Sequence, residues 1–295
     1  MLQNIIQSHS TLRVRRRAEI AVNALLLELE SASGEVLPEW PPGAHLDIRL
    51  PSGLTRQYSL CGAREDRSTY VLVVLREPHG RGGSEEIFRE FGVGTEFISS
   101  TPRDHFRLVD ASEYVLIAGG IGITPIKAMV DELRARGARW HLHYGGRSRE
   151  HMAFLDELVD LGGDNVSIVP QDVDGLLDVR AIIGNLSPEA AIYCCGPAPL
   201  LDAVLTACAE AGPLSVSTSS ASCRQPTALG LPSTGTLPSR WSSGARGSLS
   251  RFRRTRPSSR WCKASSQTCR SRARRATAEV VNRLCLRVCP IIGEL

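Results

Sequence analysis

The chain has 295 residues, of which 42% are hydrophobic and 5% aromatic, so it is long enough for two or three packed domains. Its net charge of +4 hides a division along the chain. Residues 1–214 hold 20 Lys and Arg against 29 Asp and Glu, whereas residues 215–295 hold 15 against two. No apolar run approaches the roughly 18–20 residues that span a bilayer, so no membrane association is expected.

The N-terminus lacks the charged-then-apolar order of a signal peptide. Together with nine cysteines, this predicts a cytoplasmic protein whose thiols are free or ligate metal.

The first hundred residues predict short strands. Segments 44–50, 56–62 and 68–77 are strand candidates beside a longer region, 11–30, and turns rich in Pro, Gly and charge separate them. One helix is expected at 84–91. Strands at this spacing predict a small antiparallel β-barrel, which we assign to residues 1–108.

From residue 109 to 212 strands alternate with helices. Strands are expected at 113–119, 139–146, 166–170 and 190–196, and helices at 124–137, 149–162, 178–186 and 197–212. This alternation predicts an α/β domain whose parallel sheet is covered on both faces.

The turn GGIGITP begins directly after the first strand of this α/β domain. Gly119, Gly120 and Gly122 precede a helix, where backbone N–H groups and the helix N-terminus can face a phosphate. The turn differs from the dinucleotide fingerprint GxGxxG. We interpret it as a nucleotide-binding turn; the alternative is an ordinary tight turn.

Two other strands of the domain end in candidate ligand-binding residues. CCGP places Cys195 where it could pack against a nicotinamide ring, although a small buried hydrophobe is the simpler reading. HYGGRS offers Arg147 and Ser148 at the same sheet edge.

The barrel has two candidate contacts of its own. In RQYSL, Arg56 could pair with a phosphate, while Tyr58 and Ser59 could contact a ring system; the alternative is a plain strand with alternating faces. GRGGS, at residues 80–84, opens the expected helix and offers a second anion site.

In this order the motifs resemble those of the ferredoxin–NADP reductase superfamily, and within it the branch of phthalate dioxygenase and vanillate demethylase reductases. The resemblance covers about residues 5–212. It implies FMN at the barrel and NADH, with NADPH left open, across the α/β domain. The flavin contacts it implies are Arg56, Gln57, Tyr58, Ser59, Gly82, Gly83 and Ser84. The implied nucleotide-site residues are Gly119, Gly120, Gly122, Thr124, Arg147, Ser148, Cys195, Gly196 and Pro197. Of these, Tyr58, Ser59 and Cys195 are the expected catalytic residues.

The resemblance also implies a Rieske-type oxygenase as electron acceptor and a C-terminal [2Fe–2S] ferredoxin domain. Hydride transfer between two cofactors needs no protein acid or base, so the lack of a catalytic dyad is expected. The cluster needs C-x₄-C-x₂-C and one further cysteine. No trio among Cys223, Cys262, Cys269, Cys285 and Cys289 has that spacing, so no metal site is expected in this chain.

Residues 213–295 are rich in Ser and Arg and predict a disordered tail in place of the ferredoxin domain. We hypothesise a frameshift near residues 212–215. Codons built from the third base of one residue and the first two of the next can read Arg-Val-His-Phe-Glu-Arg-Phe across 215–222. Across 271–282 they can read Ser-Cys-Glu-Glu-Gly-Tyr-Cys-Gly-Ser-Cys-Glu, which restores the C-x₄-C-x₂-C pattern.

The expected activity is therefore electron transfer from NADH through FMN, limited in this chain to diaphorase activity. Two other readings compete with it. A genuine basic tail would bind nucleic acid, which explains the charge but not the ferredoxin pattern in the neighbouring frame. An inactive frame-shifted product would be insoluble and colourless.

Overall fold

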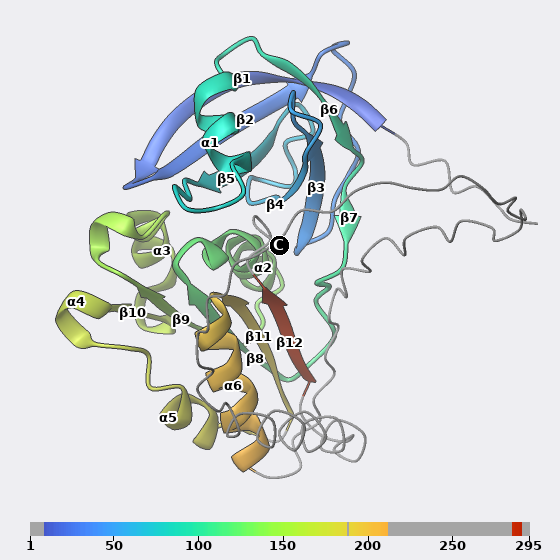
Figure 1. Ribbon diagram of the computed structural model, residues 1–295. Helices are drawn as coiled ribbons and strands as arrows, with labels where there is room; N and C mark the ends of the chain where they lie inside the picture. The colour runs from blue at the N-terminus through green and yellow to red at the C-terminus, as the bar shows by residue number, and fades with distance from the viewer. Residues whose placement is uncertain (1–8, 188, 212–284, 291–295) are drawn as a thin grey trace, which may run out of the picture. The chain divides into compact units, whose positions relative to one another are not determined.

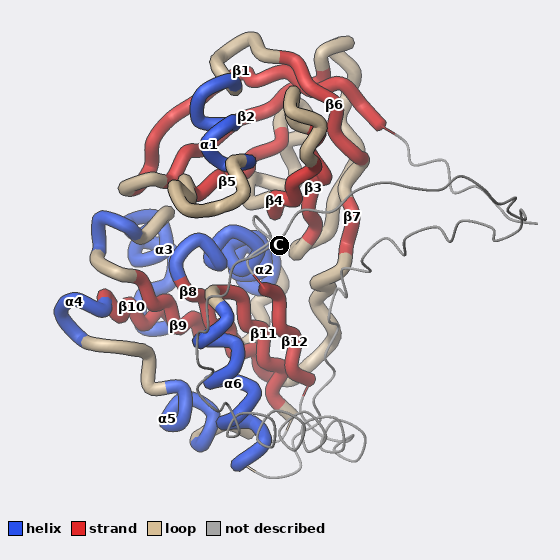
Figure 2. Tube along the Cα trace, in the orientation of Figure 1, coloured by secondary structure: helices blue, strands red, loops and turns tan. Residues whose placement is uncertain are grey.

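The structure is a computed structural model that describes residues 9–187, 189–211 and 285–290. These residues form two sheets in succession along the chain (Figure 1). Figure 2 shows the change in organisation, from mostly strands at first to strands that alternate with helices.

The first sheet is antiparallel, in the order β4-β3-β6-β1-β2-β5, with the short β7 paired to β3. Its strands are β1 (His9–Ala21), β2 (Ala24–Ser31), β3 (Ala44–Arg49), β4 (Thr55–Ser59), β5 (Tyr70–Leu75), β6 (Glu96–Ser100) and β7 (Arg103–Asp104). Beyond the end of β4, the Cys61 amide donates to the Val71 carbonyl of β5 at 2.9 Å. This bond joins the two ends of the strand order, as a barrel requires.

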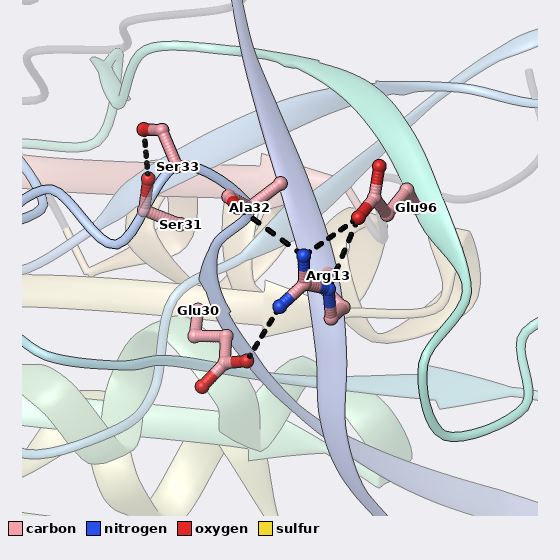
Figure 3. Close-up of polar contacts among 6 residues, drawn as sticks. All are labelled: Arg13, Glu30, Ser31, Ala32, Ser33 and Glu96. Carbon is pink, nitrogen blue, oxygen red and sulfur yellow. Dashed lines mark hydrogen bonds and ion pairs between the residues drawn. The ribbon is translucent and has the colours of Figure 1, made fainter.

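One face of these strands forms the barrel core. Leu12, Leu27, Leu46, Ile48 and Leu72 are fully buried, and α1 (Gly83–Glu90) adds Ile87. On the solvent side, Arg13 of β1 forms ion pairs with Glu30 of β2 and Glu96 of β6 (Figure 3). These exposed pairs cross the three strands but contribute little to stability.

The second sheet is parallel, in the order β10-β9-β8-β11-β12. Its strands are β8 (Glu113–Gly119), β9 (Trp140–Gly146), β10 (Val166–Pro170), β11 (Ala190–Gly196) and β12 (Cys285–Pro290). The glycine turn forms a 3₁₀ turn, η1 (Gly120–Gly122), that leads directly into α2 (Ile123–Ala135). Every residue of β11 is buried, as expected of a strand in a sheet covered on both faces.

Side chains alternate between the two faces of this sheet. Leu116 and Ala118 of β8 pack with residues of α2 and α3 (Leu155–Gly162), whereas Val115 and Ile117 pack with α5 (Val179–Gly184) and α6 (Ala198–Glu210). The remaining elements are η2 (Arg149–His151), η3 (Gly163–Asn165) and α4 (Gln171–Asp174).

The predicted fold class is confirmed, with three local differences. The helix expected at 149–162 is divided, because Phe154 adopts a left-handed φ of 60° that a continuous helix cannot contain. The strand β6 and the short helix α4 were not predicted.

The third difference lies in the tail, which was expected to be disordered. Residues 285–290 form β12 instead, because the backbone edge of β11 offers hydrogen-bond partners to an added parallel strand (Figure 1). The rest of the tail lies outside the described residues. Among the residues described, no helix is long and apolar enough to cross a membrane.

Candidate functional site

Arg56 of β4 is a buried cation, and no acidic side chain among the described residues forms an ion pair with it. It is 7% exposed, and its Nη1 donates to the Thr55 carbonyl at 3.1 Å. Its Nε and Nη2 have no hydrogen-bond partner within the described part of the chain. A buried guanidinium with two unused donors is costly, so this position favours an anionic ligand.

The first turn of α1 lies directly against this guanidinium. A Cβ placed on Gly83 would lie 2.4 Å from Arg56 Nε, so a larger residue there would force the Arg56 side chain to move. Gly82 precedes the helix with a left-handed φ of 82°, which also favours glycine. The free N–H groups of a helix start and the Arg56 donors therefore meet in one place, and this arrangement fits a phosphate group.

The other residues of β4 divide between its two faces. Tyr58 follows Arg56 on the same face and is 5% exposed within the barrel core. Gln57 lies on the opposite face, where its amide donates to Asp47 Oδ1 at 2.7 Å, so the structure does not bring it to Arg56. Ser59 shares that opposite face and is half-buried. Ser84 is buried, and its hydroxyl accepts from the Glu77 amide at 3.0 Å.

The three glycines of the α/β turn have different roles. A Cβ on Gly122 would lie 2.2 Å from the Cys195 carbonyl oxygen, and one on Gly119 would lie 2.7 Å from a Leu200 methyl group. These two glycines therefore allow the turn to pack against the end of β11 and the start of α6. Gly120 has a φ of 54° and no neighbour within 4 Å of an added Cβ, which leaves its backbone open to a ligand.

The carboxyl ends of three strands meet beside this turn. Ala118 of β8 pairs with Cys195 of β11, and Gly119 pairs with Gly145 of β9. Cys195 is 3% exposed, and Gly196 approaches Gly119 so closely that its added Cβ would lie 3.1 Å from the Gly119 Cα. The edge formed by these strand ends is where ligands bind in open α/β sheets.

The remaining predicted nucleotide contacts surround this edge. Pro197 is exposed and directly precedes α6, and Thr124 is buried, with its hydroxyl donating to the Ile121 carbonyl at 3.1 Å. Arg147 is exposed just after β9, and its carbonyl accepts from the Asp172 amide at 3.1 Å. The Ser148 hydroxyl lies 2.7 Å from His151 Nδ1. The assignment of these residues as nucleotide contacts stays a prediction.

The turn also contacts the antiparallel sheet. Ile121 packs in one apolar cluster with Leu26, Cys61 and Val73 of that sheet. The predicted nucleotide turn and the sheet that carries Arg56 are thus joined by packed side chains, which exclude water from the contact.

Sequence reasoning missed a polar cluster on the outer face of β3 and β4, made of His45, Asp47 and Arg103. The alternation in AHLDIRL was the available signal, because it places His45 and Asp47 on one face of a strand. Within the described residues, no group of three or more His, Cys, Asp or Glu could hold a metal ion. Cys223, Cys262 and Cys269 lie outside those residues.

Residues 116–206 match the oxidoreductase NAD-binding domain. The chain is 41% identical over 208 residues to a phenoxybenzoate dioxygenase subunit beta of Ectopseudomonas oleovorans, covering 70% of this chain and 65% of that protein. It is 37% identical over 198 residues to a phthalate dioxygenase reductase of Burkholderia cepacia, covering 65% of this chain and 62% of the relative.

Among solved structures, one of phthalate dioxygenase reductase matches at 36% identity with a TM-score of 0.65, covering 68% of this chain and 64% of that one. An antiparallel flavin-type barrel followed by a matching NAD-binding domain defines the class of ferredoxin–NADP reductase-like oxidoreductases. Within that class, the chain is similar, at 34–41% identity, to reductases of the phthalate dioxygenase and vanillate demethylase branch. It spans about three fifths of the length of the curated relatives it matches.

Proposed function

We propose that residues 1–108 bind FMN, that residues 109–212 bind NADH, and that the chain passes electrons from NADH to FMN. The observation that carries this proposal is Arg56, a buried guanidinium that lies against the first turn of α1 and has two donors without a partner among the described residues. A phosphate there would satisfy both donors and the N–H groups of the helix start.

FMN, when bound, accepts a hydride and gives up its electrons singly, and the protein binds, orients and shields the reactants. Arg56 and the α1 turn hold the phosphate, while Tyr58 and Ser59 contact the ring system. Gly120 and the end of β11 admit the nicotinamide nucleotide, with Cys195 against its ring. The apolar cluster around Ile121 keeps water from the contact between the two parts.

We further propose a Rieske-type oxygenase as the acceptor in intact relatives, whose names describe reductase subunits of oxygenases. In this chain, residues 213–295 stand in place of a [2Fe–2S] domain, so its own activity is limited to diaphorase reactions with artificial acceptors. Within the described residues, Cys61 and Cys208 form no disulfide, which favours a cytoplasmic location.

The test compares FMN with riboflavin, which lacks the phosphate. We expect the purified chain to bind FMN about 100-fold more tightly than riboflavin, because two charge-assisted hydrogen bonds contribute about 1.5 kcal/mol each. The bound FMN should lose its yellow colour when NADH is added without oxygen. Equal affinity for the two flavins, or FMN that stays oxidised with NADH, would contradict the proposal.

A further inference from the structure

The segment that connects the two sheets lies against two buried tyrosines. This connecting segment, residues 105–112, runs from the end of β7 in the antiparallel sheet to the start of β8 in the parallel sheet. Tyr114 of β8 and Tyr193 of β11 are buried in one apolar cluster, and their rings are stacked with centroids 6.5 Å apart. The chain therefore passes from the proposed FMN-binding part to the proposed NADH-binding part beside these two rings.

Both tyrosine hydroxyls bond to the backbone of the connecting segment. The Tyr193 hydroxyl accepts from the Val109 amide at 2.7 Å and donates to the Arg107 carbonyl at 3.2 Å. The Tyr114 hydroxyl accepts from the Ala111 amide and donates to the Val109 carbonyl, each at 3.0 Å. Each phenol thus acts as a donor and as an acceptor. The bonded backbone groups belong to alternate residues, so the hydroxyls take the place of a neighbouring strand.

The beginning of the connecting segment is held by the barrel. Directly before it, Asp104 of β7 pairs in register with Ala44 of β3. A Cβ on Gly43 would lie 2.2 Å from the Phe106 carbonyl oxygen, so the turn before β3 contacts the segment itself. The Phe106 ring meets the Tyr193 ring edge to face, with centroids 5.6 Å apart. Direct contacts therefore run from the barrel through Phe106 to β11, the strand that ends in the predicted nicotinamide contact.

We propose that Tyr193 is a positioning residue for hydride transfer, because its hydroxyl fixes the segment that joins the FMN-binding part to the NADH-binding part. This rests on the proposed function, in which the two cofactors are held by different sheets. Hydride transfer needs reacting atoms about 3–3.5 Å apart, and a misplacement of about 1 Å costs about 100-fold in rate. A segment that sets the orientation of one sheet toward the other therefore controls the rate without contacting either cofactor.

The hydroxyl of Tyr193, rather than its ring, has this role. The ring is buried among apolar side chains, where a phenylalanine ring would pack as well. Val109 uses both of its backbone groups in bonds to tyrosine hydroxyls. A partly buried amide that loses its partner costs free energy, so the hydroxyl favours the one conformation of the connecting segment that satisfies Val109. Tyr114 is close to Val109 in sequence and shapes the segment locally, whereas Tyr193 ties it to a distant strand.

The substitution Tyr193→Phe removes this hydroxyl and keeps the ring. In anaerobic stopped-flow at saturating NADH, we expect reduction of bound FMN to slow at least about tenfold, while the dissociation constants of FMN and NADH stay within about twofold of wild type. Tyr144→Phe is the matched control, because the Tyr144 hydroxyl is also buried but donates to the Ala153 carbonyl at 3.3 Å. This control should lower the urea midpoint about as much as Tyr193→Phe and reduce FMN at the wild-type rate.

Amide hydrogen exchange of the flavin-free protein reads the same contact without turnover. The Val109 amide should exchange at least about tenfold faster in Tyr193→Phe than in wild type, and at the wild-type rate in Tyr144→Phe. Unchanged Val109 exchange or unchanged FMN reduction in Tyr193→Phe would overturn the role of Tyr193 while the proposed function stands, and so would equal slowing of FMN reduction in Tyr144→Phe. A wild-type chain that neither binds FMN nor oxidises NADH would instead overturn the proposed function, and the role of Tyr193 with it.

Discussion

Replacing Arg56 by methionine tests whether this arginine binds a ligand or stabilises the fold. The guanidinium is 7% exposed, and two of its nitrogens lack partners within the described residues. A buried charged group left unsatisfied costs about 1–3 kcal/mol, and methionine fills a similar volume without that cost. We expect the flavin-free Arg56→Met protein to gain about 2 kcal/mol in its free energy of unfolding.

The same change should weaken FMN binding. Loss of two charge-assisted hydrogen bonds removes about 3 kcal/mol, or about 100-fold in affinity, while riboflavin affinity stays near that of wild type. Urea unfolding of the flavin-free protein and fluorescence titration with the two flavins measure both effects.

Arg49→Met is the matched control, because Arg49 is an exposed arginine on the neighbouring β3. We expect Arg49→Met to change neither the free energy of unfolding nor the free energy of FMN binding by more than about 0.5 kcal/mol. If flavin-free Arg56→Met were less stable than wild type and bound FMN normally, Arg56 would be a structural residue and the reasoning would be refuted.

Three further outcomes are expected. Gly122→Ala should lower the free energy of unfolding by about 1–3 kcal/mol, because its Cβ would lie 2.2 Å from the Cys195 carbonyl oxygen; equal urea midpoints would contradict this. Unfolding free energy should fall as pH drops from about 6.5 toward 4, because burial lowers the pKa values of buried His45 and half-buried His143 to about 4 and only the unfolded chain gains their protons there. Urea midpoints at pH 7.5, 5.5 and 4.5 measure how stability depends on pH. This dependence should flatten in the double variant His45→Gln with His143→Gln, and an unchanged dependence would contradict the assignment. Resequencing the source DNA around codon 213 should find an added or missing base that restores a ferredoxin frame, whereas a confirmed frame would rule the frameshift out.

The sequence predicted both sheets because the spacing of hydrophobic residues differs clearly between the two parts of the chain. The alternation in 44–50 and the buried runs at 113–119 and 190–196 are local signals, and the structure has strands at these places. The division of the helix at Phe154 was not predictable in this way, because nothing in the residue type announces a left-handed φ. Nor could a local pattern reveal β12, which pairs with a strand about ninety residues earlier.

The candidate site was predicted as a set of motifs, but the role of each residue depends on packing. The segments RQYS and GRGGS could each be an ordinary strand or turn with no ligand. Only the structure shows that Gly83 is in close contact with the Arg56 guanidinium. Gln57 illustrates the converse: it stands between two predicted flavin contacts, yet strand alternation turns it toward Asp47. The motif therefore indicated a candidate site, while the pleat of β4 decided which of its side chains share a face.

The glycine turn shows how one motif can satisfy two demands. Gly119 and Gly122 have neighbours too close for any side chain, so they would be required even if the protein bound nothing. Gly120 has open space around it and needs glycine only for its backbone angle, so it is the position whose backbone remains free for a ligand. Because packing alone requires two of the three glycines, the motif supports nucleotide binding mainly through Gly120. The stronger physical argument for a cofactor in this chain comes from the two Arg56 donors that have no partner in the described part of the chain, which packing does not explain.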